Sequence, residues 1–170
     1  MRKRGNVMRQ RAAYFGIFTA LAMILSYIES LFPVFIGIPG VKLGLANSMS
    51  LTILYLLGTP AAFLISFIRI TLTGFLFGNL FSIFYSFAGA LLSMILMSCM
   101  KKCKAFSVLG ISMAGGVAHN IGQILVAMIL VENLNLLYYL PVLLISGAVT
   151  GFLIGIISQE IIHRLPKGMV

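Results

Sequence analysis

The chain has 170 residues, of which 61% are hydrophobic and 9% are charged, and its net charge is +9. Its mean hydropathy of +1.11 excludes a soluble globular domain and predicts an all-α integral membrane protein. A spanning helix needs about 20 mostly apolar residues, so we expect about six such helices in a single transmembrane domain, residues 1–170. The basic residues gather at the ends of apolar segments, which indicates the lipid bilayer as partner and no nucleic acid.

Apolar runs and the glycine- and proline-rich breaks between them predict six transmembrane helices. We expect them at about residues 12–32, 45–57, 61–77, 80–100, 106–131 and 137–162. The second is short for a full span. The loop 33–44 before it carries prolines and glycines, and it either dips into the membrane or is a plain connector.

The distribution of basic residues predicts the orientation. Apart from Lys42 and Arg69, every lysine and arginine falls within residues 2–11, 101–104 or 164–167. With six helices, these three segments lie on one side and Lys42 lies on the other. The positive-inside rule then places both termini in the cytoplasm of a bacterial cell, with the protein in its inner membrane.

Small residues repeat every four positions on two of the expected helices. On the first helix they are Ala12, Gly16 and Ala20, and on the sixth they are Gly147, Gly151 and Gly155. Such stripes let another helix approach closely. A third stripe, on the fourth helix, is more polar and is typical of a packing face: Ser82, Ser86, Gly89 and Ser93.

The stretch 115–123 (Gly-Gly-Val-Ala-His-Asn-Ile-Gly-Gln) places three polar side chains in the middle of a long apolar segment. On a helix, His119 and Gln123 share a face, and Asn120 lies beside them. An unsatisfied polar group in hydrocarbon costs several kcal/mol. These side chains therefore face a ligand pocket, or they hold neighbouring helices together as small residues and amides do. We favour the pocket, because intramembrane polar clusters are commonly functional.

Arg69 lies near the centre of the third expected helix. A central arginine costs about 2.5 kcal/mol or more on membrane insertion. Two interpretations stay open. Arg69 pairs with Glu29 or with backbone carbonyls as part of the packing, or it grips an anionic part of a ligand, which a guanidinium does well.

The standard catalytic patterns are absent from the sequence. There is no Gly-x-x-x-x-Gly-Lys phosphate loop, and the three acidic residues are Glu29, Glu132 and Glu160, far apart in the chain. Neither a magnesium site nor a metal site at Cys99 and Cys103 is indicated. We therefore predict a binding or transport protein, with no enzymatic activity and no cofactor.

Several motifs together resemble those of a known family. They are 29–33 (Glu-Ser-Leu-Phe-Pro), 39–47 (Pro-Gly-Val-Lys-Leu-Gly-Leu-Ala-Asn), Arg69 with 74–79 (Gly-Phe-Leu-Phe-Gly-Asn), 85–91 and 115–123. Over nearly the whole chain they resemble the bacterial Gx transporter family, also labelled heptaprenyl diphosphate synthase component I. That family is similar to the S components of energy-coupling factor (ECF) vitamin transporters, which have six membrane helices and bind a vitamin from outside.

The resemblance implies partners and a mode of action. S components dock on a transmembrane scaffold subunit that two ATPases drive. The stripe Ala12, Gly16 and Ala20 matches in kind the face with which S components meet the scaffold, and the loop with Lys42 resembles the one that gates their pocket. The synthase label implies a different class, but prenyl diphosphate synthases need aspartate-rich motifs and this chain has no aspartate.

We therefore expect a substrate-binding component for uptake of a vitamin-like small molecule, with flavin-, quinone- and isoprenoid-related compounds as candidates. Its ligand is expected to be acidic, given Lys42 and Arg69 against Glu29. The expected binding residues are Arg69, His119, Asn120, Gln123, Asn47, Asn79, Lys42, Tyr85, Tyr27 and Glu29. The alternatives are a non-catalytic membrane subunit for prenyl diphosphate or quinone synthesis, a structural subunit of a flavin-dependent electron-transfer complex, and a stand-alone transporter.

Overall fold

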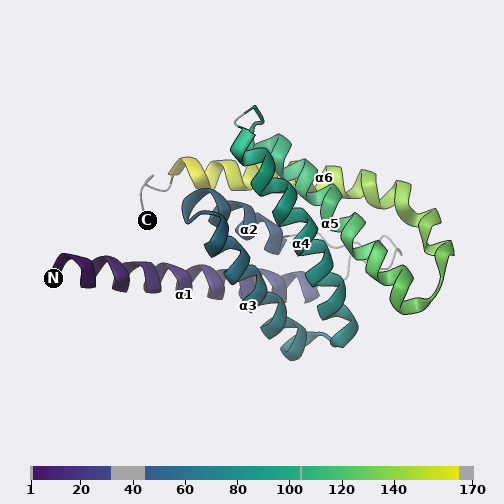
Figure 1. The fold of residues 1–170 in the computed structure, drawn as a ribbon, viewed down its shortest axis with the longest axis horizontal. Coiled ribbons are helices and arrows are strands. Elements are labelled where there is room, and N and C mark those ends of the chain that lie inside the picture. Colours follow the sequence, from purple (N-terminus) through teal and green to yellow (C-terminus); the bar gives the residue numbers. More distant parts are fainter. Residues whose placement is uncertain (1, 32–44, 104, 165–170) are drawn as a thin grey trace.

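The computed structural model describes residues 2–31, 45–103 and 105–164, without the side chains of residues 2–11, 30, 45 and 46. In this part of the chain there are six α-helices and one 3₁₀ helix, and no strand (Figure 1). They are α1 (Arg2–Leu31), α2 (Leu45–Leu56), α3 (Thr59–Phe77), α4 (Leu80–Cys103), α5 (Val108–Val131), η1 (Leu134–Tyr139) and α6 (Leu140–Arg164).

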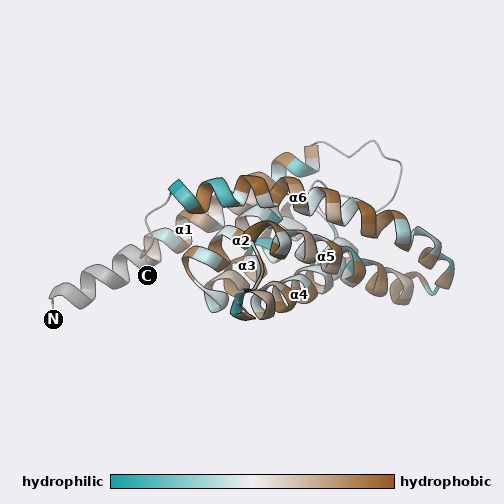
Figure 2. Ribbon diagram, turned by 90° about the horizontal axis from the view of Figure 1, so that it is seen from above, coloured by the Kyte–Doolittle hydropathy of each residue, from teal (hydrophilic) through white to brown (hydrophobic). Residues whose placement is uncertain are grey.

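Five of the described helices are long and apolar enough to cross a membrane. The exception is α2, whose 12 residues extend over about 18 Å against a hydrocarbon core of about 30 Å. Large hydrophobic side chains are exposed on the outer surfaces of the long helices. Hydrophobic residues predominate along α6 up to its hydrophilic last turn, which carries His163 and Arg164 (Figure 2). The chain is thus an all-helical, multi-pass membrane protein.

Two helix starts differ from the expected positions by three residues or more. The first helix begins at Arg2 rather than near residue 12. The apolar run marks where a helix enters hydrocarbon, whereas arginine, lysine, methionine and glutamine before it are good helix formers and continue the same helix. The last helix begins at Leu140, and the apolar residues just before it form the 3₁₀ turn η1, which Asn133 caps by accepting a hydrogen bond from the backbone nitrogen of Asn135 at 2.9 Å.

The short helix α2 lies inside the bundle, where it contacts α1, α3 and α6. Its side chains form the centre of the main hydrophobic core, and Leu51, Ile53 and Leu54 are fully buried. Hydrogen bonds connect it to its neighbours as well. Ser50 shares a hydrogen bond of 3.0 Å with Ser66 on α3, and Ser158 on α6 donates to the carbonyl oxygen of Ser48 at 3.1 Å.

Glycines bring α5 into close contact with helices on two of its sides, α4 and α6 (Figure 1). A Cβ atom at Gly116 would collide with the carbonyl oxygen of Gly147, and one at Gly151 would lie 2.7 Å from the carbonyl oxygen of Ser112. Towards α4, a Cβ at Gly122 would lie 2.6 Å from the carbonyl oxygen of Ala88. The close packing predicted from the glycine stripe of α6 is confirmed, and α5 is fixed as the central helix of the α4–α5–α6 layer.

Candidate ligand-binding site

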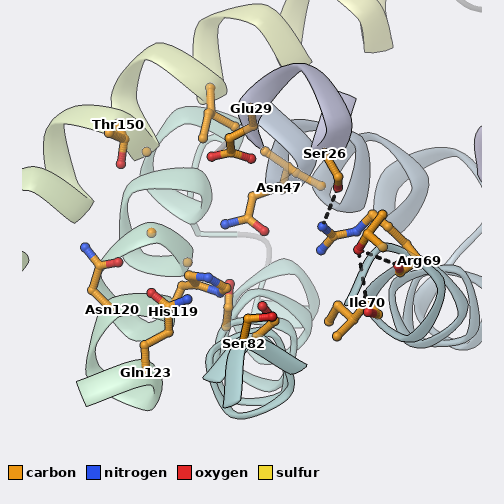
Figure 3. Close-up of a pocket in the computed structure, with 18 of the residues that line it drawn as sticks. Ser26, Glu29, Asn47, Arg69, Ile70, Ser82, His119, Asn120, Gln123 and Thr150 are labelled. Carbon is orange, nitrogen blue, oxygen red and sulfur yellow. Dashed lines mark hydrogen bonds between the residues drawn. The ribbon is translucent and has the colours of Figure 1, made fainter. Parts of the chain in front are cut away.

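A cavity of about 220 Å³ lies between the helices, and residues from α1 to α6 line it (Figure 3). Six of the expected binding residues line it: Glu29, Asn47, Arg69, His119, Asn120 and Gln123. They come from α1, α2, α3 and α5, so the fold brings distant polar positions together at one place. A polar cavity among helices of spanning length is an unusual and costly environment, which marks it as the candidate site.

Arg69 reaches this cavity from α3 and is 8% exposed. Its Nη1 donates a hydrogen bond to Ser26 Oγ on α1 at 3.0 Å, and its Nε is buried without a hydrogen-bond partner among the described residues. The negative charge of Glu29, which lines the same cavity, acts on Arg69 and partly offsets its charge. Arg69 is thus held in place by α1 while part of its hydrogen-bonding capacity is unused.

His119 and Gln123 line the cavity from neighbouring turns of α5. The His119 ring packs directly against α4, because a Cβ atom at Gly89 would lie 2.8 Å from ring atoms Cε1 and Nδ1. Gly89 therefore has a specific function in the polar stripe of α4: it makes room for the imidazole. The side chains of His119 and Gln123 lie on the same side of α5 in Figure 3, as their spacing predicts.

Asn120 has a structural partner as well as a place at the cavity. Its Nδ2 donates to the carbonyl oxygen of Leu143 on α6 at 2.7 Å and to Ser146 Oγ at 3.4 Å. The sequence left open whether the polar residues of α5 form a pocket or hold helices together. The amide nitrogen of Asn120 holds α5 and α6 together, as the second interpretation expects. The residue also lines the cavity.

Hydroxyl side chains that were not among the expected binding residues complete the lining. They are Ser26, Thr73, Ser82, Ser86, Ser93, Ser112 and Thr150. The α4 serines were expected to form a packing face. Their four- and seven-residue spacing was the available signal, but the same spacing serves helix packing and a cavity wall equally well. Thr150 lies within the glycine stripe of α6, where nothing in the sequence sets it apart.

Four expected binding residues do not contribute to the described lining. Asn79 caps α4, since its Oδ1 accepts from the backbone nitrogen of Ser82 at 2.8 Å. Tyr27 packs against Phe77, with ring centroids 4.8 Å apart. Tyr85 is half-buried on α4 away from the cavity lining. Lys42 lies outside the residues that the structure describes.

The small-residue stripe of α1 is on the surface. Ala12, Gly16 and Ala20 are all exposed, and a Cβ atom at Gly16 would meet nothing within 4 Å. The α6 stripe differs, because atoms of α5 occupy the space beside its glycines. No described part of the chain therefore covers the expected docking face.

A family model described as heptaprenyl diphosphate synthase component I matches residues 18–161. The chain belongs to this family. The match includes every described residue that lines the cavity. A search of curated proteins and a search of solved structures each gave no match. Family membership and the apolar helices together make the chain a multi-pass membrane component of the heptaprenyl diphosphate synthase component I family.

Proposed function

We propose that this chain is a membrane substrate-binding component that takes part in the uptake of a small organic molecule. The observation that carries the proposal is the polar cavity with the buried Arg69 inside a bundle of spanning helices. A bundle needs no such lining to be stable, because apolar residues in these places would avoid the cost of burying charge and amides in hydrocarbon.

The size of the cavity limits the ligand. Its volume of about 220 Å³ is just below the range of about 300–1,000 Å³ typical of small-molecule pockets. It suits a small vitamin-like molecule or the polar head of a larger one, such as a quinone or isoprenoid compound. Arg69, His119, Gln123 and Asn47 would give the directional contacts, and the residues that also pack helices would shape the walls.

A separate module would supply the energy for uptake. In this proposal the exposed stripe Ala12, Gly16 and Ala20 meets a transmembrane scaffold subunit with ATPases, as in ECF transporters. Its small side chains would let a partner helix approach closely. The protein would lie in the bacterial inner membrane with both termini in the cytoplasm, so that the basic segments face the partner ATPases.

The family description supports a second candidate, a non-catalytic membrane subunit that associates with a prenyl diphosphate synthase. The sequence contains no aspartate, so this chain would leave the magnesium and diphosphate chemistry to its partner. In that case the cavity would hold a prenyl or quinone-type compound during its synthesis.

Identifying the bound partner separates the two candidates. The tagged chain is purified in mild detergent from its host membrane after brief cross-linking, and its partners are identified by mass spectrometry. An ATPase module lost in Gly16→Leu and kept in Ile17→Phe, which adds bulk at the neighbouring exposed position, would support uptake. A soluble prenyl synthase without any ATPase would contradict uptake and support the second candidate.

A further inference from the structure

The short buried helix α2 begins at the cavity. Asn47, its third residue, lines the cavity together with Leu51 one turn later, while Met49, Ile53 and Leu54 are buried in the hydrophobic core. The first backbone N–H groups of a helix have no partner within the helix, and they form the positive end of its dipole. In α2 the first turn borders the cavity, because Asn47 lines it.

The opposite end of α2 carries a compensating cation. Lys101 of α4 donates a hydrogen bond from Nζ to the carbonyl oxygen of Leu54 at 2.6 Å, and its Nζ lies 4.9 Å from the centroid of the Tyr55 ring. The negative end of the dipole is therefore neutralised by a positive side chain, a favourable arrangement at a helix C-terminus. The contact with Lys101 does not change the positive end of the α2 dipole, which lies at the cavity.

Arg69 provides an independent observation at the same place. Its side chain is 8% exposed, its Nη1 is engaged by Ser26, and its buried Nε has no hydrogen-bond partner in the described part of the chain. The Nε–Nη2 edge of a guanidinium is the fork that holds two oxygens of a carboxylate or phosphate. In Figure 3 the guanidinium of Arg69 points into the cavity, toward the side chain of Asn47.

We propose that the cavity binds an oxyanion, a carboxylate or phosphate group of the ligand, between the Nε–Nη2 edge of Arg69 and the first turn of α2. This rests on the proposed function, in which the cavity holds a ligand. Glu29 also lines the cavity, and its charge repels an anion, so the oxyanion lies on the Arg69 side. Ser26 acts as a positioning residue, because its hydroxyl fixes the guanidinium through Nη1.

The test compares two probes of equal shape and different charge, benzoate and benzamide. Saturation-transfer NMR measures their binding to the full chain in nanodiscs, with empty nanodiscs as the baseline and inorganic phosphate as competitor. We expect benzoate to bind at least about tenfold more tightly than benzamide, because a charged group adds two charge-assisted hydrogen bonds. Stronger competition by phosphate than by unlabelled benzoate would identify a phosphate site, and weaker competition would identify a carboxylate site.

Variants connect the binding to Arg69. Arg69→Gln should lower benzoate affinity at least about tenfold, and Arg69→Lys, which keeps the charge but lacks the fork, should lose most of it. Arg164→Gln removes an arginine that is exposed at the end of α6 and should leave the affinity unchanged. Circular dichroism confirms that each variant keeps its helices, and Arg69→Lys covers the case in which Arg69→Gln fails to fold.

Three results would overturn the oxyanion site: equal binding of benzamide and benzoate, full benzoate binding in Arg69→Lys and Arg69→Gln, or no saturable binding of either probe. The proposed function is judged separately, from molecules that co-purify with the chain. A bound molecule without an acidic group would overturn the oxyanion site and leave the proposed function standing.

Discussion

Asn120 on α5 donates a hydrogen bond of 2.7 Å to the carbonyl oxygen of Leu143 on α6, three residues before Ser146, its second partner. The same side chain lines the cavity. One residue thus connects the wall of the candidate site to the contact between two spanning helices. Its two functions can be separated, because helix packing affects stability whereas ligand contact affects affinity.

Replacing Asn120 should lower stability more than it lowers ligand binding. In Asn120→Ala the hydrogen bond to Leu143 is lost, which costs about 0.5–1.5 kcal/mol in a membrane protein. Thermal unfolding followed by circular dichroism measures the effect, and Asn135→Ala, at an exposed position in η1, is the control. Unchanged stability together with lost ligand binding would show that the amide serves the ligand instead.

The glycine contact between α5 and α6 should be intolerant of even one methyl group. Gly116→Ala places a Cβ atom against the backbone oxygen of Gly147, which cannot move without the whole helix. We expect a loss of about 1–3 kcal/mol, typical of overpacking, seen as a lower unfolding temperature. Gly16→Ala is the matched control, because its Cβ meets nothing within 4 Å and alanine favours a helix by about 1 kcal/mol. Equal behaviour of the two variants would contradict the close packing.

Removing the lysine at the end of α2 should loosen that helix. In Lys101→Met the hydrogen bond to Leu54 and the contact with Tyr55 are lost, at an expected cost of about 1 kcal/mol. Hydrogen exchange of the α2 amides reports the change locally. Lys102→Met, at the next and exposed position, should leave these amides as protected as before, and faster exchange in both variants would rule out a specific contact.

The main features of the fold could be predicted from the sequence because placing a polar group in hydrocarbon costs so much free energy. Arg69 and His119 could not face lipid at low cost, so placing them inside the bundle followed from their position in apolar segments. The close packing of α6 could also be predicted from the sequence, since glycines at every fourth position have few other uses in a spanning helix.

The remaining features depend on contacts that sequence spacing does not encode. Asn79 looked like a binding residue, but its amide is used locally to cap α4 with Ser82, an arrangement that any turn asparagine can adopt. Lys101 looked like a membrane-surface charge, and only the tertiary fold brings it to the end of α2. The α4 serines are small enough to suit either a packing face or a cavity wall.

Native mass spectrometry of the chain, purified gently from its host membrane, tests the ligand site around Arg69 most directly. We predict a small molecule bound in a ratio of about one to one, released on unfolding, lost in Arg69→Gln and retained in Arg164→Gln. A wild-type chain that is empty in all preparations, or that holds the same molecule in both variants, would contradict a ligand site built around Arg69.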